Sequence, residues 1–596
     1  MMTSPSSTPA PAESSFELNG KTIHVDAMDA GRSLLETLRE QCGMTSVKDG
    51  CAPQGQCGCC TVLVDGEARV SCVTATSRVF GRSVVTVEGL EPDRKDALAN
   101  AFVACGASQC GFCTPGIAMR LAPLLGTQPS STTVNNALAA HMCRCTGWQP
   151  IVEAFTAAEC EMLSTTDPAA AGGLAKQQPA PRENAAVAAA QSALEWNVQQ
   201  PCDRRNIEGT IAFADDDAPL DALVAVPTML DLPDAIEAAG MRWILAPTRA
   251  EARRIAGHTQ GRKTTEEPRP PIDVPTEGTI RLATCWVDSG YLEPDASWCV
   301  PGGEPASPRR FGGAFGGKAG SPLPEAARAL ADKVGQPVRA LWSREDVARY
   351  AVKRPPMAAQ AELVDQVVAV RGMVAAPAAA TFRSLLSKIT LPYALDVHAN
   401  WDEVALVGPP VSPMIRAAGL AELWVLVEAL LDEAGRDRRV LVNDPIASSV
   451  LLDTCAPSKS GALAGARVTL NAVGALDHVE VRVAAGRPID PRILRSYCIG
   501  AVHAALGWTL SESMVVDPLT GEVKTLTIRG LGQLRPKDMP TVEITIVEDD
   551  RDACAAGDAV FAAVAAATWN AVTKFSGERP VIFPMRDSAA GRPLRR

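Results

Sequence analysis

Residues 50–62 read Gly-Cys-Ala-Pro-Gln-Gly-Gln-Cys-Gly-Cys-Cys-Thr-Val, so four cysteines share one glycine-bearing loop. A further cysteine, Cys72, lies beyond the apolar stretch at residues 61–64. Three closely spaced thiolates and a distant fourth form the ligand pattern of plant-type [2Fe–2S] ferredoxins, although the first gap is one residue longer here. Cys59 is predicted to be a small buried residue. The spacing therefore predicts one [2Fe–2S] cluster, with Cys51, Cys57, Cys60 and Cys72 as ligands.

A second set of cysteines occupies two short motifs further along the chain. Residues 109–116 read Gln-Cys-Gly-Phe-Cys-Thr-Pro-Gly, and residues 143–148 read Cys-Arg-Cys-Thr-Gly-Trp. A C-x2-C pair and a C-x-C pair at adjoining helix ends can enclose two irons, which makes Cys110, Cys113, Cys143 and Cys145 the predicted ligands of a second [2Fe–2S] cluster. A zinc site with four cysteines is the alternative, because C-x2-C pairs are common in such sites.

The composition favours an intracellular redox protein. Twelve of the 18 cysteines precede residue 161, and cytosolic thiols in such numbers call for a metal or redox role. A formal net charge of -11 offers no field that attracts nucleic acid or anionic lipid. No apolar run approaches the ~18 residues of a membrane span, and the first residues lack the features of a secretory signal. We expect a cytoplasmic protein without nucleic-acid or membrane partners.

A chain of 596 residues with these patterns is predicted to be an α+β multidomain protein. The predicted order is a disordered tail at 1–14, a ferredoxin-like domain at 15–92, a helical domain at 93–163, a linker at 164–201, and an α+β region at 202–596. The linker is assigned from its alanine, glutamine and proline content.

Local patterns support this order. Apolar and polar residues alternate around Asn19-Gly20, which predicts a β-hairpin. Ser33, with Glu36 three residues on, predicts a helix start. In the last region we expect strands at 479–483 and 542–547, and helices at 326–334, 422–432 and 561–572.

Residues 16–163 closely resemble the iron–sulfur subunit or domain of the xanthine dehydrogenase/aldehyde oxidase family of molybdenum hydroxylases. The matching motifs begin at Asp49, Cys57, Val87, Gln109 and Cys143. The resemblance implies a β-grasp fold for the first cluster domain and a helical bundle for the second. It also implies that Gln109 and Cys145 lie beside a molybdopterin cofactor, so that the helical cluster accepts electrons first.

The resemblance continues in the last region. Arg310-Phe-Gly-Gly-Ala-Phe-Gly-Gly-Lys318 resembles the family's glycine-rich loop at the molybdenum, which implies that Gly312, Gly313, Phe315, Gly316 and Gly317 hold the cofactor. Arg416 resembles the family's substrate-side arginine. Asp558 stands where the family has a glutamate that acts as general base, and is one methylene shorter.

Other departures also fall near the expected chemistry. Ala319 replaces the glutamate of xanthine-specific members, which disfavours xanthine as substrate. Residues 497–501 read Tyr-Cys-Ile-Gly-Ala where the family has Gln-Ile-Glu-Gly-Gly, so hydrogen-bonding capacity toward a cofactor is reduced. Residues 201–596 are also far fewer than the usual molybdenum subunit contains.

Three functions compete on this basis, one of them a structural zinc protein that has kept the scaffold. The first is a molybdenum hydroxylase that oxidises an aldehyde or N-heterocycle with water and passes electrons through two [2Fe–2S] clusters. The second is an electron-transfer subunit whose degenerate molybdopterin domain partners a separate molybdenum-containing catalytic chain. No flavin-binding segment is evident, so a flavoprotein or other external electron acceptor is expected as partner. A small-molecule substrate and an oligomeric assembly are expected as well.

Overall fold

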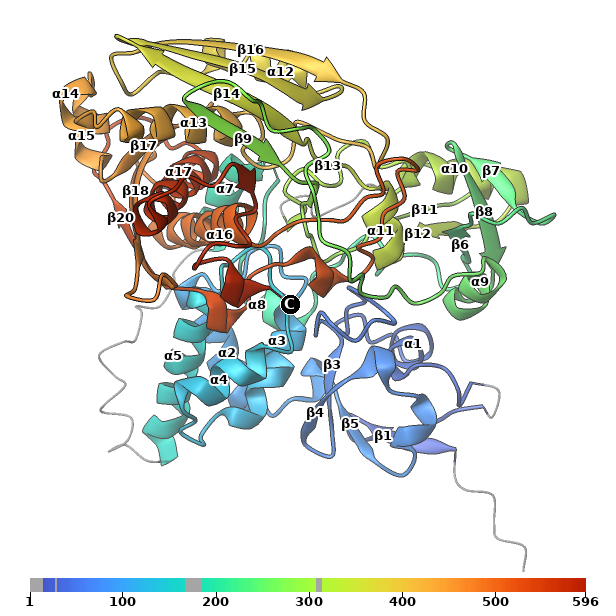
Figure 1. The fold of residues 1–596 in the computed structure, drawn as a ribbon. Coiled ribbons are helices and arrows are strands. Elements are labelled where there is room, and N and C mark those ends of the chain that lie inside the picture. The colour runs from blue at the N-terminus through green and yellow to red at the C-terminus, as the bar shows by residue number, and fades with distance from the viewer. Residues whose placement is uncertain (1–13, 27–28, 167–184, 197, 307–312, 596) are drawn as a thin grey trace, which may run out of the picture.

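The computed structural model describes residues 14–26, 29–166, 185–196, 198–306 and 313–595. The predicted tail at residues 1–14 lies outside this part of the chain, apart from Ser14. Figure 1 shows the N-terminal elements, in blue, below two groups of later elements that hold sheets of their own. The predicted α+β multidomain class is confirmed.

The first sheet has the strand order β2-β1-β5-β3-β4. Strands β1 and β2 pair antiparallel, and Asn19 and Gly20 between them have φ angles of 49° and 81°. Positive φ at both central residues is what a two-residue hairpin turn requires, so the predicted hairpin is confirmed. The strands are β1 (Ser15–Leu18), β2 (Lys21–His24), β3 (Thr61–Val64), β4 (Glu67–Val70) and β5 (Ser83–Val85).

The helix predicted to begin at Ser33 does so. The Ser33 hydroxyl accepts the backbone N–H of Glu36, and the Glu36 carboxylate accepts the backbone N–H of Ser33 at 3.2 Å. This reciprocal capping satisfies two donors that a helix start leaves without partners. After α1 (Leu34–Glu36), the chain continues as a π-helical turn at Thr37–Gln41, which leads toward the first cysteine loop.

The next part of the chain is helical, as predicted. Gly111 and Gly147 break the helices, with φ angles of 85° and 65°. At Gly147 a Cβ atom would lie 2.6 Å from the carbonyl oxygen of Ile499, so the turn there requires glycine. These breaks place the two cysteine pairs just before α3 and α5. The helices are α2 (Pro92–Cys105), α3 (Thr114–Leu121), α4 (Ser131–Leu138) and α5 (Gln149–Thr166).

The segment interpreted as a linker, residues 164–201, contains a helix that we did not predict. Helix α7 (Ala185–Trp196) packs against the start of α16 (Pro491–Leu510). Gln191 Oε1 accepts the backbone N–H groups of Ile489 at 2.9 Å and Asp490 at 3.3 Å. The end of the segment is therefore docked on the later region.

Three sheets build the rest of the chain, with the orders β11-β12-β6-β8-β7, β16-β15-β14-β9-β21 and β17-β18-β19-β20. Their strands are β6 (Leu223–Pro227), β7 (Ile236–Ala238), β8 (Met241–Ala246), β9 (Ile280–Thr284), β11 (Ala296–Cys299), β12 (Val338–Leu341), β14 (Met357–Val364), β15 (Val367–Ala375), β16 (Asp396–Val404), β17 (Thr454–Pro457), β18 (Leu463–Leu470), β19 (Leu476–Ala484), β20 (Thr541–Ile546) and β21 (Ile582–Phe583). A separate pair is β10 (Val287–Asp288) with β13 (Lys353–Arg354).

The largest apolar core gathers around α13, α16 and α17. Every residue of α13 from Leu420 to Leu431 is buried, including Glu422 and Glu428, which are paired with Arg354 and Arg438. The strands and helices predicted for this region are confirmed as β19, β20, α10, α13 and α17. Its helices are α8 (Arg204–Glu208), α9 (Arg249–Ile255), α10 (Leu323–Val334), α11 (Arg344–Tyr350), α12 (Ala379–Arg383), α13 (Leu420–Glu433), α14 (Arg438–Leu441), α15 (Pro445–Val450) and α17 (Gly557–Ser576).

Buried ion pairs join the ferredoxin-like sheet region to the later region. Lys48 lies 2.7 Å from Asp216, and Arg39 lies 2.8 Å from the same carboxylate. Arg249 pairs with both Asp49 and Asp215. Because buried charges are costly without partners, these pairs fix the segment just before the first cysteine loop against the later region.

Candidate functional site

The first cysteine loop brings its thiols together around its own backbone amides. Cys51 Sγ accepts the backbone N–H groups of Gln56 and Cys57, each at 3.3 Å. Contacts with the Cys57 thiol and then the Cys72 thiol hold the pKa of Cys51 well below its usual range. Cys72 also contacts the thiol of Cys60. The four predicted ligands are therefore neighbours.

Glycines let the first loop fold this tightly. Gly58 has a φ of 75°, and a Cβ atom there would lie 2.5 Å from the imidazole Nδ1 of His141. At Gly50 a Cβ atom would lie 3.0 Å from Cys57 Sγ. Cys59 is fully buried, as predicted. At Gly50 and Gly58, the thiols and the residues around them therefore leave no room for a side chain.

The second set of cysteines forms two close pairs. Cys110 and Cys145 have their sulfurs 3.5 Å apart. Contact with the Cys113 thiol lowers the pKa of Cys143 to about 6. Two thiolates bound tetrahedrally to one metal at ~2.3 Å lie about 3.7 Å apart, so the first pair has nearly the separation that one iron requires.

Among the described residues, no group of three or more His, Cys, Asp or Glu side chains is arranged to hold a single metal ion. A [2Fe–2S] cluster with four cysteines needs no such group, because each iron takes only two protein ligands. A zinc ion bound by four cysteines needs all four around one point. Cys110 lies next to Cys145 and Cys113 next to Cys143, so the observed pairs match the two ligands that each iron takes.

The two sets of cysteines are tied to each other by the backbone. Met142, which precedes Cys143, donates its backbone N–H to the carbonyl oxygen of Cys57 at 2.9 Å. The side chain of His141 packs over Gly58 in the first loop. The proposed clusters would therefore sit in adjoining parts of one buried region.

The described part of the glycine-rich loop lies against the second set of cysteines. A Cβ atom at Gly313 would lie 2.8 Å from Cys110 Sγ and 3.6 Å from Cys145 Sγ. Gly316 and Gly317 likewise have no room for a side chain, Gly316 against the backbone of Met414 and Gly317 against Ser289. Gly312 lies outside the described residues. The resemblance and the geometry thus agree that backbone approaches closely here.

Phe315 links this loop to Arg416. Its φ is 53°, which is uncommon for a residue with a side chain, and its carbonyl oxygen accepts the backbone N–H of Arg416 at 3.1 Å. The Arg416 guanidinium lies 5.0 Å from the Phe315 ring centre and 4.9 Å from that of Trp196. Both rings attract the cation through their faces.

Arg416 is buried, and none of its three guanidinium nitrogens has a hydrogen-bond partner. Burial lowers its pKa, while Glu195 and Asp558 act in the opposite direction. Asp558 stands at the start of α17, and its Oδ1 accepts the backbone N–H of Ala417 at 3.1 Å. The structure thus brings Arg416 and Asp558 to the same part of the fold.

Gln109 connects the second set of cysteines to α16. Its Nε2 donates to the carbonyl oxygen of Cys145 at 3.1 Å and to the hydroxyl of Ser496 at 3.0 Å. Next to Ser496, the Tyr497 hydroxyl is buried without a hydrogen-bond partner. Gln109 therefore positions Cys145, and Tyr497 adds a free polar atom.

Whether the site suits a molybdopterin cofactor can be judged from its buried polar atoms that lack hydrogen-bond partners. Arg416, Tyr497, Ser289 and Gln533 all present buried side-chain atoms that make no hydrogen bond. Such groups are costly unless a ligand or water satisfies them, so they suit a polar cofactor with many acceptors. The internal space between Cys110, Cys145 and Gly313 is only about 10 Å³, however, and Trp196 lies against Arg416.

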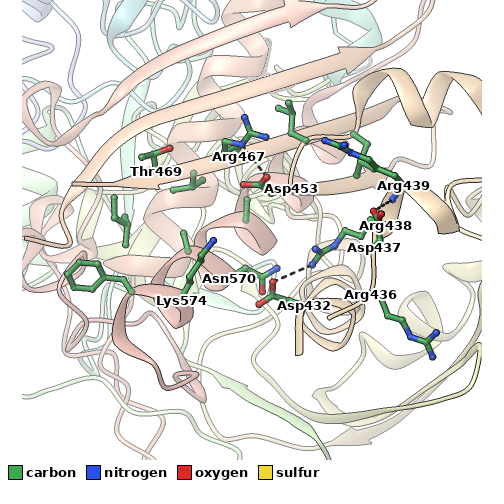
Figure 2. A pocket seen from close by; sticks show the side chains of 17 residues that line it. Asp432, Arg436, Asp437, Arg438, Arg439, Asp453, Arg467, Thr469, Asn570 and Lys574 are labelled. Atoms are coloured by element: carbon green, nitrogen blue, oxygen red, sulfur yellow. Dashed lines mark hydrogen bonds and ion pairs between the residues drawn. The ribbon is translucent and has the colours of Figure 1, made fainter. Parts of the chain in front are cut away.

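Larger clefts open at the surface. Figure 2 shows one of about 790 Å³, lined mainly by the start of α14, strand β18 and the end of α17. Two of its four arginines are paired with carboxylates that also line it, Arg467 with Asp453 at 3.1 Å and Arg438 with Asp432 at 3.7 Å. None of the predicted cluster ligands or cofactor-binding residues lines this cleft.

Glu195 and Trp196, at the end of α7, are the site residues that sequence reasoning missed. Glu195 Oε1 accepts the backbone N–H of Ala556 at 2.8 Å, and Oε2 accepts that of Gly557 at 3.1 Å. The alanine-rich run of α7 is a helix-favouring signal that the linker interpretation set aside. No local pattern showed where the helix would dock.

Known families match two parts of the chain. The [2Fe-2S] binding domain family matches residues 86–156, and the molybdopterin cofactor-binding domain family matches residues 306–440. The first range contains the whole second set of cysteines, so zinc is set aside there. The second range contains the glycine-rich loop and Arg416.

Related proteins match the N-terminal part at high identity. The nicotine 6-hydroxylase small subunit of Paenarthrobacter nicotinovorans is 44% identical over 152 residues, which are 25% of this chain and 91% of that protein. The xanthine dehydrogenase iron-sulfur-binding subunit of Escherichia coli O157:H7 is 41% identical over 149 residues, 24% of this chain and 91% of that protein. The aldehyde oxidoreductase of Megalodesulfovibrio gigas is 43% identical over 133 residues, 21% of this chain and 15% of that protein.

The fold of the whole chain resembles a solved structure, the aldehyde oxidoreductase from Desulfovibrio gigas. The TM-score is 0.72 at 16% identity, and the match covers 97% of this chain and 99% of that one. No helix of the described residues is long and apolar enough to cross a membrane. From its sequence relatives and its two family matches, the chain belongs to the xanthine dehydrogenase/aldehyde oxidase family of molybdenum hydroxylases, which are oxidoreductases with [2Fe–2S] and molybdopterin cofactors.

Proposed function

We propose that this chain oxidises an aldehyde or N-heterocycle with water at a molybdopterin site, and sends the electrons through two [2Fe–2S] clusters to an external acceptor. One observation carries the proposal. The glycine-rich loop touches the second set of cysteines, at Gly313 against Cys110 and Cys145. A cofactor held by that loop would therefore lie directly beside the helical cluster.

The proposed electron order follows from this contact. Cys110, Cys113, Cys143 and Cys145 would bind the cluster that accepts electrons first. Cys51, Cys57, Cys60 and Cys72 would bind the cluster that passes them outward. Cys72 lines a surface cleft of about 580 Å³, which supports an exit to a flavoprotein or other acceptor on that side.

We assign the domains to match these roles. Residues 15–92 form the ferredoxin-like domain, 93–163 the helical cluster domain, and 202–596 a shortened molybdopterin-binding region. The segment 164–201 connects the last two, and its helix α7 lies against both of the features that would contact substrate, Arg416 and the start of α17.

The site residues have distinct proposed tasks. When bound, the molybdopterin cofactor supplies the centre that takes electrons from the substrate. Arg416 orients the substrate through its unpaired guanidinium nitrogens. The Asp558 carboxylate accepts the proton that water loses in the oxidation. Phe315 and the glycines around it hold the cofactor, and the buried position of Arg416 excludes solvent water.

Substrate-driven reduction tests this function. The purified protein should contain molybdenum, and an oxidisable aldehyde or N-heterocycle should bring up the EPR signals of reduced clusters without any other reductant. D558N should lose turnover by about 100-fold or more, because a misplaced or missing base is this costly. Dithionite should still reduce both clusters in D558N. Substrate turnover by D558N at the wild-type rate would contradict the proposed base.

Placement of α7 favours a second candidate function, the electron-transfer subunit that partners a separate catalytic chain. Glu195 and Trp196 occupy the space beside Arg416 that a substrate would use. Molybdenum analysis separates the two functions. Protein produced with ample molybdate that contains two clusters but no molybdenum would overturn the first proposal and support the second.

A further inference from the structure

A buried carboxylate with one unpartnered oxygen lies beside the second set of cysteines. Glu293 lines the same internal space of about 10 Å³ as three of the predicted ligands, Cys110, Cys113 and Cys145. Its Oε2 lies 2.8 Å from Lys318 Nζ, and the two side chains are 10% and 1% exposed. Its Oε1 is buried without a hydrogen-bond partner. Such an oxygen is costly unless water or a proton satisfies it.

A second internal space connects Glu293 to the surface. This space has a volume of about 30 Å³, and Glu293 lines both it and the smaller space beside the cysteines. Asp49, Ala52 and Arg253 line both the 30 Å³ space and the surface cleft next to Cys72. The three spaces therefore adjoin one another and form a passage from the cleft to the second set of cysteines.

The 30 Å³ space has the chemistry of a water site. Four of the residues that line it each have a buried side-chain atom without a hydrogen-bond partner, namely Glu293 Oε1, Arg344 Nη1, Arg249 Nε and Trp342 Nε1. A buried water needs about 10–15 Å³ of such space and two to four polar partners, so about two waters fit here. Water chains of this kind carry protons between side chains.

Other ionisable groups around the second set of cysteines are less suited to exchange a proton through this passage. Both carboxylate oxygens of Glu512 bond Arg144, and neither residue lines the 30 Å³ space. Burial lowers the pKa of His141 well below its usual range and that of His503 to about 3, so both rings stay neutral. Glu293 is the carboxylate with both a free oxygen and a path to the surface.

Reduction of the second cluster adds one negative charge to this buried region. Like charges repel strongly where water is scarce, so a nearby carboxylate binds a proton more readily once the cluster is reduced. Burial already raises the pKa of Glu293, Asp295 and Asp216 raise it further, and Lys318 acts in the opposite direction. A reduced cluster therefore favours the protonated form of Glu293 still more.

We propose that Glu293 takes up a proton from the surface cleft, through this passage, each time the second cluster is reduced. The cluster gains one electron and the Glu293 carboxylate gains one proton, so the buried region gains no net charge. When the electron moves on to the first cluster, the proton returns along the same passage. The proposal needs the second cluster alone, so it applies to either candidate function.

Redox titration followed by EPR tests the proposal without substrate. The potential of the second cluster, identified by the signal that C113S removes, should fall as pH rises from about 6 to about 9, because the reduced state binds the extra proton. E293Q should remove this dependence on pH. E293D keeps a carboxyl group and should retain the dependence.

Glu512 gives the matched control. It is a buried carboxylate whose partner, Arg144, lies between Cys143 and Cys145, but it does not line the passage. E512Q should shift the potential of the second cluster by the same amount at every pH and leave its dependence on pH unchanged.

Proton uptake can also be followed directly with a pH indicator. Reduced methyl viologen serves as the reductant, because its oxidation to methyl viologen releases one electron and no proton. Uptake should keep pace with reduction in the natural chain. A296V narrows the 30 Å³ space that Ala296 lines, and should slow uptake at least about tenfold without changing its extent.

Three results would each overturn the proposal. They are a potential of the second cluster that does not depend on pH in the natural chain, an unchanged dependence in E293Q, and equally fast proton uptake in A296V. Absence of molybdenum from the same preparation would instead count against the proposed hydroxylase, and would leave these measurements readable.

Discussion

The iron–sulfur region at residues 15–163 resembles its relatives in sequence, whereas the cofactor region at residues 202–596 resembles them mainly in fold. Three relatives of the first are 41 to 44% identical to it over 133 to 152 residues. The whole chain superimposes on an aldehyde oxidoreductase at 16% identity. Cluster ligation needs thiols at fixed positions, whereas an apolar core accepts many sequences of similar volume and pattern. Sequence identity therefore identifies the relatives of the first region, whereas the fold identifies those of the second.

The largest expected effect is the loss of a whole cluster when one of its ligands is replaced. C113S should remove one of two EPR signals and lower iron from about four to about two atoms per chain, because a [2Fe–2S] cluster needs its four ligands. EPR and iron analysis measure this. C455S is the control, since Cys455 is equally buried but lies in the cofactor region. Retention of both signals in C113S would refute the ligand assignment.

A buried ion pair between the two regions comes next. Arg144, between two predicted ligands, bonds the Glu512 carboxylate through both Nη atoms, and neither side chain is more than 8% exposed. R144M should lower the free energy of unfolding by about 3–5 kcal/mol, because it leaves a buried carboxylate unpaired. Urea denaturation measures the loss.

Another ion pair that joins the same regions gives the control for R144M. Arg204 and Asp96 are about half exposed, and exposed pairs contribute about 0–1 kcal/mol. R204M should therefore change the unfolding free energy by no more than about 1 kcal/mol. Equal losses in R144M and R204M would mean that burial does not decide how the two regions hold together.

A glycine in the first loop should show a somewhat smaller effect. G58A forces a positive φ on alanine and places its Cβ against buried His141, at a cost of about 2–4 kcal/mol. G66A has a similar φ of 81° but nothing within 4 Å of the new atom, so it should cost only about 1 kcal/mol. Chemical denaturation compares the two. The prediction fails if G66A is as destabilising as G58A.

The smallest expected effect is a pH dependence in the cofactor region. Burial lowers the pKa of His503 to about 3, and its ring lies 3.0 Å from the Leu534 carbonyl oxygen. Above pH ~6.5 His503 is neutral in both the folded and the unfolded chain, so it does not make stability depend on pH. As pH falls below ~6.5 the unfolded chain binds a proton that the folded chain does not, so stability falls by up to ~1.4 kcal/mol per pH unit.

The variant H503Q should remove that loss between pH 6.5 and 5, and keeps a donor for Leu534. Exposed His398 serves as the control, and H398Q should leave the slope of stability against pH unchanged. Denaturation midpoints over this range give both slopes. An unchanged slope in H503Q would show that His503 is not the group responsible.

Local features were predictable from the sequence, and long-range contacts were not. The hairpin at Asn19-Gly20 and the helix start at Ser33 follow from residues only a few positions apart. The helix α13 follows from a long and largely apolar run. Glu195 meets Gly557 across more than 350 residues, and nothing in the alanine-rich segment specified that docking. Close packing in three dimensions decides such contacts.

The same reason explains what was predictable at the candidate site. Cysteine spacing predicted both sets of neighbours, because each set consists of short motifs with a recognisable spacing, even though Cys110 and Cys145 are 35 residues apart. The surroundings of Arg416 come from three distant segments, the glycine-rich loop, α7 and α17. Resemblance supplied Arg416 and Asp558, but the carboxylate and ring that face them could only be found in the fold.

Metal analysis and EPR of the reduced, purified chain show directly whether it holds two clusters. We expect about four irons per chain and two distinct signals of reduced [2Fe–2S] clusters, one of which C113S removes. Stoichiometric zinc with no iron, or iron with one signal only, would contradict this expectation.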